Sequence, residues 1–295
     1  MIEHVPVLIG EILDIYRAYP SRGHVLDCTL GLGGYAEAIL SSSDARLIGI
    51  DQDEQALAFS RDRLRRFGDR FDGVKANFRS LPEEVTSRAP FGAFFFDLGV
   101  SNLQLTDDAR GFSFQSDGPL DMRMDLASNR SAADIVNSGT EGEIADIFWK
   151  YGEERHSRRL ARAIVRHREA VGSIMRTETL VAVIRGALPA PVQRKMGGHP
   201  ARRVFQALRI AVNEELCALQ EGLQAIPSLA APGALLFVVS YHSLEDRIVK
   251  TVFRLWKEQG RGEILSKRLI RPSSDEVESN RKSRSAKLRV FRFNP

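Results

Sequence analysis

The sequence has few cysteines and no long hydrophobic run. Cys28 and Cys217 are its two cysteines among 295 residues, and they form neither a disulfide framework nor a metal-binding spacing. No apolar stretch approaches the roughly 20 residues needed to span a bilayer. The segment Met1–Asp14 contains acids and lacks the basic start of a signal peptide. These absences argue against a disulfide-stabilised secreted protein, a bound metal and a membrane protein, and we expect a cytoplasmic chain.

The composition is otherwise ordinary for a soluble globular protein, with 43% hydrophobic and 27% charged residues. A chain of this length can bury a large core and form one or two domains. The formal net charge is only +4, but Lys150–Arg209 and the C-terminal tail are rich in arginine. A lopsided basic surface indicates a polyanionic partner such as a nucleic acid. For any single arginine, a solvated helix face is the simpler interpretation.

Residues 24–51 carry the strongest functional pattern. They predict a strand that ends in Asp27, a glycine turn at Gly31–Gly34, a helix, and a second strand that ends in Asp51. Glycine allows positive φ and lets a ligand approach bare backbone. An acid about 20 residues beyond such a turn, at the tip of the second strand, suits the hydroxyls of a ribose. The segment therefore predicts a site for a nucleoside cofactor.

The glycine turn lacks the spacing of the dinucleotide pattern G-x-G-x-x-G. Asp27 stands directly before the turn, where a carboxylate would repel a pyrophosphate but could accept hydrogen bonds from an ammonium group. S-adenosylmethionine has an amino-acid end, a sulfonium and a ribose, so it is the cofactor that we predict. The alternatives are an NAD-dependent oxidoreductase, a non-catalytic RNA-binding protein that kept the fold, and a turn that only packs a helix onto a sheet.

Apolar runs predict about seven strands, four before a long helical block and three after it. They cover residues 24–28, 46–50, 71–76, 91–96, 233–240, 262–270 and 287–293. This order predicts an α/β fold, a class I (Rossmann-like) methyltransferase core at 1–105 and 210–295. An all-helical substrate-recognition domain is inserted at 106–209.

Four candidate ligand-binding side chains follow the predicted strands. They are Asp27, Asp51, Phe78 and Asp97. Because ligands of open α/β sheets bind at the carboxyl ends of the strands, we expect these side chains to converge. Phe78 could stack on an adenine ring or simply pack in the core.

The segment Arg110–Asp125 fits neither helix nor strand periodicity and mixes aromatic residues with acids and arginines. Such a segment is either a loosely packed loop or a functional lid. Phe112, Phe114 and Tyr241 are candidates to stack on a flipped base, with core packing as the alternative. Beyond the loop, five arginines share one face of a predicted helix and could hold an RNA backbone: Arg155, Arg158, Arg159, Arg162 and Arg166.

Several longer motifs together resemble the MraW/RsmH methyltransferases of bacteria over nearly the whole chain. They are His4–Leu8, Asp27–Gly34, Asp97–Gln104, Arg110–Asp125, Tyr151–Arg155, His199–Ala201, Phe205–Ile210 and His242–Arg247. The resemblance implies methylation, by S-adenosylmethionine, of the exocyclic N4 of a cytosine in the decoding region of small-subunit (16S) ribosomal RNA. It also implies 16S rRNA within an assembled small subunit as the partner, and it leaves a homodimer open.

By position, the resemblance implies cofactor contacts at Gly33, Gly34, Tyr35, Asp51, Phe78, Asp97 and Gln104. Many members of the family have His where this chain has Tyr35. A contact through the imidazole would be lost by this change, whereas a contact through the backbone would remain.

The sequence also lacks the Asp/Asn/Ser-Pro-Pro-Tyr clamp that familiar amino-methyltransferases carry after the fourth strand. Asp97-Leu98-Gly99-Val100 stands at that place. Asp117 and Asp121, in the Arg110–Asp125 loop, are therefore our candidates to accept hydrogen bonds from the cytosine amino group. The alternative for both is a capping or ion-paired role. We expect the loop to close over the target base.

Overall fold

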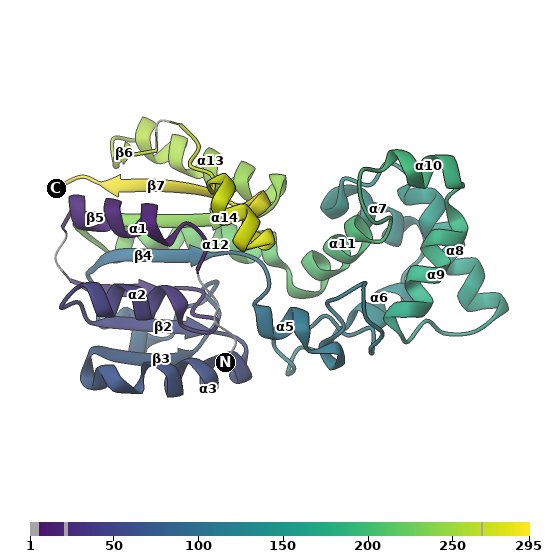
Figure 1. The fold of residues 1–295 in the computed structure, drawn as a ribbon, viewed down its shortest axis with the longest axis horizontal. Coiled ribbons are helices and arrows are strands. Elements are labelled where there is room, and N and C mark those ends of the chain that lie inside the picture. The colour runs from purple at the N-terminus through teal and green to yellow at the C-terminus, as the bar shows by residue number, and fades with distance from the viewer. Residues whose placement is uncertain (1–5, 21–22, 267) are drawn as a thin grey trace. The chain divides into compact units, whose positions relative to one another are not determined.

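The computed structural model describes residues 6–20, 23–266 and 268–295, so His4 and Val5 of the first motif lie outside the described residues. The chain divides into two compact units (Figure 1). We call residues 1–101 with 216–295 the sheet unit, and residues 102–215 the helical unit.

The sheet unit is built on a seven-stranded sheet with the order β3-β2-β1-β4-β5-β7-β6. Its strands are β1 (His24–Asp27), β2 (Leu47–Asp51), β3 (Phe71–Lys75), β4 (Phe91–Asp97), β5 (Ala230–Ser240), β6 (Gly262–Ile264) and β7 (Lys287–Phe293). Strands β1 to β5 pair in parallel, while β7 runs antiparallel to both β5 and β6. The predicted α/β class, with four strands before the helical block and three after it, is confirmed.

Helices cover both faces of this sheet (Figure 1). On one face lie α1 (Ile9–Ala18), α2 (Gly34–Ser42) and α3 (Glu54–Leu64). On the other lie α4 (Glu83–Thr86), α12 (Glu215–Leu229) and α13 (Ser243–Glu258). Alternate side chains of β4 pack on the two faces of the sheet, Phe95 on the first and Phe94 and Phe96 on the second. A parallel strand covered on both sides is apolar at nearly every position, which is why β4 was readable in the sequence.

Residues 272–285, before β7, are polar and rich in Ser and Arg, a composition that predicts a mobile stretch, but in the structure this segment contains helices. It contains α14 (Ser274–Ser279) and the 3₁₀ helix η3 (Arg281–Ser285); a further 3₁₀ helix, η1 (Arg65–Arg70), follows α3. The Ser273 hydroxyl caps α14 by accepting from the Glu276 N–H at 3.1 Å. The Glu276 carboxylate accepts from the Leu8 N–H at 2.8 Å, which ties the segment to the start of the chain. A contact across 268 positions leaves no local pattern in the sequence.

The helical unit, all of which the structure describes, consists of helices and loops without a strand. It contains α5 (Asn102–Thr106), η2 (Asp108–Arg110), α6 (Ala132–Ser138), α7 (Glu141–Gly152), α8 (Ser157–Ala170), α9 (Thr177–Ala187), α10 (Ala190–Lys195) and α11 (Arg202–Asn213). The helical spacing of the apolar residues predicts one continuous helix over 204–223: Phe205, Leu208, Val212, Leu216 and Leu219. The structure breaks it at Glu214, whose left-handed backbone (φ 48°, ψ 34°) ends α11 before α12 begins.

None of the helices in the described ranges combines the length and hydropathy needed to cross a membrane.

Candidate active site

The glycine turn after β1 is closed against the tip of β2. Gly31 and Gly33 have φ values of 50° and 76°, which L side chains rarely adopt. The Gly31 N–H donates to Asp51 Oδ2 at 2.8 Å, and the Asp53 N–H donates to Asp51 Oδ1 at 2.8 Å. Asp51 therefore holds the turn in shape. The backbone N–H of Gln52 also donates to this carboxylate. A carboxylate has about four lone-pair sites, so Asp51 can still accept from a hydroxyl group.

Asp27 is the most unusual residue of this edge. Its side chain is buried, and Oδ1 accepts from the Thr29 N–H at 3.1 Å. Oδ2 is also buried and has no hydrogen-bond partner among the described residues. Burial raises the pKa of Asp27 to about 7; the Thr29 N–H opposes the shift, and the charges of Asp97 and Asp51 add to it. A buried carboxylate oxygen without a donor indicates a place where a donor binds.

Asp97, at the tip of β4, forms hydrogen bonds with residues that follow β1 and β5. Its N–H donates to Thr29 Oγ1 at 2.6 Å, and its Oδ1 accepts from the Tyr241 hydroxyl at 2.7 Å. Burial raises the pKa of Asp97 to about 7; the hydrogen bond from Tyr241 opposes the shift, and the charge of Glu245 adds to it. The Tyr241 hydroxyl is thus bonded to Asp97, and the role of its ring in base stacking stays a prediction.

The start of α13 fixes the backbone of Tyr241. Glu245 Oε2 accepts from the N–H groups of Tyr241 at 2.8 Å and His242 at 3.2 Å. In return, the Glu245 N–H donates to His242 Nδ1 at 3.4 Å. This is a capping box with His in place of the usual Ser or Thr. This role of Glu245 has a signal in the sequence, a polar residue followed three positions later by Glu, but it was not predicted.

Electrostatically, the carboxyl edge of the sheet favours a cation. Asp51, Asp27 and Asp97 lie at the tips of the neighbouring strands β2, β1 and β4. Burial raises the pKa of Asp51 to about 6, and the hydrogen bonds from the Asp53 and Gly31 N–H groups oppose this shift. A bound positive charge would stabilise the ionised form of all three acids. The ammonium and sulfonium of S-adenosylmethionine are such charges, so the residues present fit this cofactor.

The remaining predicted cofactor residues of the sheet unit surround the same edge. Gly34 is the first residue of α2. The Tyr35 side chain is buried in the core and its hydroxyl donates to the Val7 carbonyl at 2.6 Å, which leaves its backbone for a ligand. Phe78, after β3, is half-buried and packs edge-to-face on Phe96 with ring centroids 5.3 Å apart. Their cofactor roles stay predictions.

Three predicted site residues belong to the helical unit. Gln104 is buried on α5. Asp117 Oδ2 accepts from Arg176 Nε at 2.6 Å. Asp121 accepts from Arg123 through both of its oxygens, each at 2.8 Å. The structure thus places the two candidate acids in separate ion pairs.

These ion pairs set the charge of the candidate acids. The hydrogen bond from Arg176 holds the pKa of Asp117 below its usual value. Partial burial raises the pKa of Asp121, but the hydrogen bonds and charge of Arg123 more than offset this, and the pKa is lowered. Both carboxylates are therefore ionised at neutral pH. In this form they accept hydrogen bonds and are weak bases.

The Arg110–Asp125 loop is well packed. Arg110 is buried and donates from Nη2 to the carbonyls of Arg123 and Met124, both at 2.9 Å. Phe112 is buried, and Phe114 stacks on His199 with ring centroids 4.8 Å apart. Both aromatic rings are thus used in packing within the helical unit.

Four of the five arginines in the predicted basic row lie on α8, and Arg155 precedes that helix. All five are exposed.

Comparison with known proteins gives a consistent result. A family model described as "MraW methylase family" matches residues 1–294. The ribosomal RNA small subunit methyltransferase H of Carboxydothermus hydrogenoformans is 44% identical over 305 residues, covering 97% of this chain and 96% of the relative. The protein of the same name from Sorangium cellulosum is 43% identical, covering 98% and 90%. A solved structure of a putative rRNA-methylase from Clostridium thermocellum is 12% identical with a TM-score of 0.46, covering 98% of this chain and 99% of that one, a likeness too weak to add to the assignment.

Proposed function

Since this chain belongs to the MraW methylase family and is an S-adenosylmethionine-dependent methyltransferase, we propose that it methylates the exocyclic N4 of a cytosine in small-subunit (16S) ribosomal RNA. The names of its relatives support the RNA substrate. The observation on this chain that supports the cofactor best is the buried Oδ2 of Asp27, which has no donor among the described residues.

We propose the following cofactor contacts from the chemistry of the side chains and from the family resemblance. Asp27 accepts hydrogen bonds from the ammonium group, Asp51 from the ribose hydroxyls, and the backbone of Gly33–Tyr35 lines the turn. Phe78 stacks beside the adenine, and Asp97 and Gln104 complete the contacts. When bound, the cofactor supplies an electrophilic methyl group on a sulfonium.

The chain's own residues must then orient a poor nucleophile. The lone pair of the cytosine amino nitrogen is delocalised into the ring, and a carboxylate that accepts hydrogen bonds from this amino group localises it. We assign this role to Asp117 and Asp121. As the amino nitrogen takes the methyl group, one of its protons must leave, and the carboxylate that accepts its hydrogen bond can take up this proton. Positioning of reactants is worth up to about 7–11 kcal/mol in ideal cases, and a proton acceptor typically adds about 10²–10⁴-fold. The arginine partners of both acids suit an acceptor that stays ionised.

The finer parts of the proposal concern partners, domains and location. We propose that the helical unit recognises the RNA, and that methylation takes place on 16S rRNA within an assembled small subunit. Comparison of methylation rates on naked RNA and on purified subunits tests this point. We also propose a homodimer, which sedimentation velocity tests as a species of twice 32.9 kDa.

We further propose a cytoplasmic location, which agrees with the two unpaired cysteines, Cys28 and Cys217.

Isothermal titration calorimetry tests the cofactor directly. The chain should bind S-adenosylmethionine and S-adenosylhomocysteine, and it should not bind NAD. Binding of NAD together with no binding of the two adenosyl compounds would support the oxidoreductase alternative and contradict the assignment of Asp27 to an ammonium group.

A further inference from the structure

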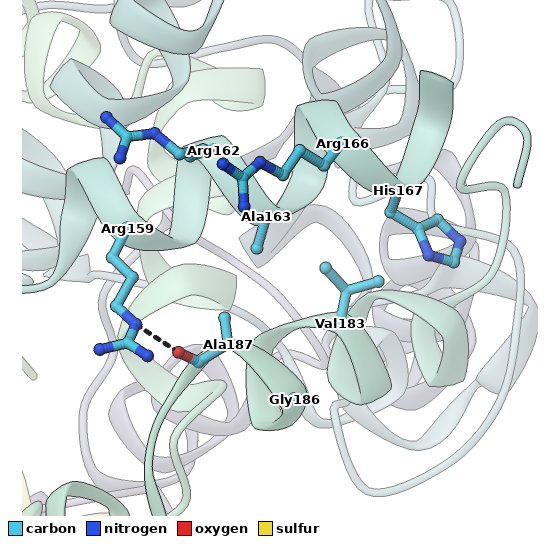
Figure 2. A pocket seen from close by; sticks show the side chains of 8 residues that line it. All are labelled: Arg159, Arg162, Ala163, Arg166, His167, Val183, Gly186 and Ala187. Atoms are coloured by element: carbon cyan, nitrogen blue, oxygen red, sulfur yellow. Dashed lines mark hydrogen bonds between the residues drawn. The ribbon is translucent and has the colours of Figure 1, made fainter. Parts of the chain in front are cut away.

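An open groove with a volume of about 770 Å³ lies between α8 and α9 in the helical unit (Figure 2). Arg159, Arg162 and Arg166 on α8 form one wall, and Figure 2 shows them opposite the α9 wall that contains Val183 and Gly186. Among the described residues, no acidic side chain lines this groove. It therefore combines a row of guanidinium groups with a wall of small, uncharged residues.

The guanidinium groups of the groove keep most of their charge unneutralised. Arg159 Nε donates to the Ala187 carbonyl at 2.5 Å, a contact with a neutral group at the end of α9. Arg162 Nε lies 3.3 Å from Glu141 Oε1, but both side chains are well exposed, so this pair is weak. Within the described part of the chain, Arg166 has no acidic partner.

The spacing of these arginines suits a regularly charged polymer. Residues three and four positions apart on a helix rise by about 4.5 and 6 Å, which is comparable to the separation of successive phosphates along a nucleic-acid strand. Guanidinium groups bind phosphate through paired N–H donors. We propose that the groove between α8 and α9 binds the phosphodiester backbone of the substrate RNA through Arg159, Arg162 and Arg166. This inference rests on the proposed function, since it takes RNA as the substrate.

Of the five arginines that the sequence predicts on one helix face, three line the groove: Arg159, Arg162 and Arg166. Arg155 and Arg158 are exposed but do not line the groove. Arg158 also lies on α8 beside Arg159, so it offers a matched control. A general basic helix face would use Arg158 and Arg166 alike, whereas a groove would distinguish them.

Gly186 offers a second, independent probe of the groove. It lies on α9, lines the groove, and a Cβ added to it would meet no heavy atom within 4 Å. Replacement of this helical glycine should also favour the helix. Gly186→Glu therefore introduces a negative charge into the groove without a steric conflict at its Cβ, and Gly186→Gln is the uncharged control of the same shape.

The test measures the affinity of the full-length chain for a fluorescent single-stranded RNA that copies the decoding region, by anisotropy over a series of salt concentrations. Arg166→Gln should weaken binding and reduce the slope of log affinity against log salt by about 1. Arg158→Gln should change neither quantity. Gly186→Glu should bind RNA more weakly than Gly186→Gln at low salt, with the difference shrinking as salt screens it. S-adenosylhomocysteine affinity should be the same in all four variants.

Unchanged RNA binding in both Arg166→Gln and Gly186→Glu would overturn the proposal, and so would equal losses in Arg158→Gln and Arg166→Gln. Tighter binding of polyglutamate than of RNA at this groove would point to an acidic protein and would also overturn it. Methylation by the wild-type chain, measured on small subunits, separates this result from the proposed function. If the wild-type chain methylates N4 while the variants bind normally, the groove proposal fails alone. If methylation is absent while Arg166→Gln lowers the slope, the proposed function fails alone.

Discussion

At the scale of single residues, Asp27 shows how burial can prepare a binding group. Folding places its carboxylate between a glycine turn and the acids of two neighbouring strands, and burial raises its pKa to about 7. An isolated acid in this place is a cost to the fold that a cationic ligand can offset. Function at this edge therefore depends on a residue that destabilises the cofactor-free chain.

We expect Asp27→Asn to lower the affinity for S-adenosylhomocysteine by about 10- to 100-fold, because it removes a charged hydrogen-bond acceptor. Calorimetry at neutral pH measures this change. The control is Asp246→Asn. Asp246 is a half-buried acid of α13 that pairs with Arg289, and it makes no proposed cofactor contact. Equal affinity in Asp27→Asn and the wild type would show that the ammonium group binds elsewhere.

The same substitution should change the pH dependence of stability. In the unfolded chain Asp27 ionises near its ordinary pKa, about 3.9, and in the folded chain near 7. Between these values the native state binds more protons, so burial of Asp27 makes the chain less stable as pH rises. Without cofactor, Asp27→Asn should gain stability over the wild type from about pH 4 to pH 7, up to about 4 kcal/mol.

Urea denaturation of both proteins at about pH 4.5 and pH 8 checks this prediction. A constant difference between the two unfolding free energies at both pH values would contradict the raised pKa of Asp27.

Tyr241 should act on the cofactor through Asp97. Its hydroxyl donates to Asp97 Oδ1 and thereby lowers the pKa of that carboxyl against the effect of burial. In Tyr241→Phe the pKa of Asp97 should rise above about 7, so the cofactor affinity should reach its plateau at a higher pH than in the wild type. Titrations between about pH 6 and 7.5, where the ligand's amino group stays protonated, measure the shift. Parallel pH profiles with a uniform loss of affinity would instead indicate a packing role.

At the scale of elements, apolar runs located six of the strands well, whereas among the described residues the predicted strand 262–270 is wrong beyond Ile264, where β6 ends. The run Phe91–Phe96 is buried on both faces, so its pattern could be read directly. The break between α11 and α12 was missed because Glu214 is an ordinary helix former whose left-handed conformation no local signal announces. The helix α14 was missed although Ser273 followed three positions later by Glu276 is a local signal for a helix start, whereas its contact with Leu8 could not be read from the sequence. Local patterns therefore gave the elements, and tertiary contacts decided where they end.

The Arg110–Asp125 loop gives the clearest prediction for an element. If Asp117 orients the cytosine amino group, Asp117→Asn should lower single-turnover methylation by roughly 10²-fold or more, with unchanged cofactor affinity. Arg176→Gln removes its ion-pair partner but keeps the carboxylate, so this variant should retain far more activity. Asp121→Asn and Arg123→Gln form the same comparison at the second acid.

Thermal unfolding of the four variants shows whether the loop remains folded. Equal losses of activity in Asp117→Asn and Arg176→Gln, with lower thermal stability in both, would mean that the ion pair only holds the loop in shape. Near-normal turnover in both acid variants would remove these residues from the mechanism.

At the scale of the whole molecule, the sequence revealed what kind of ligand binds but not how the chain prepares for it. Asp27, Asp51 and Asp97 were readable as strand-tip residues because parallel strands end at one edge. Their raised pKa values were not readable, because these depend on burial and on one another. The Tyr241 hydrogen bond to Asp97 joins residues 144 positions apart, and the direction of Tyr35 into the core follows from its contact with Val7. The groove could not be predicted from the sequence either, because its walls come from two helices, α8 and α9.

The central claim is that this chain methylates the N4 of a cytosine in 16S rRNA. Mass spectrometry of nucleosides from small-subunit RNA tests it most directly, in cells with the protein, cells without it, and cells that carry Asp27→Asn. We predict an N4-methylated cytidine that disappears without the protein and falls strongly in the variant. An identical nucleoside profile in all three strains would contradict the account.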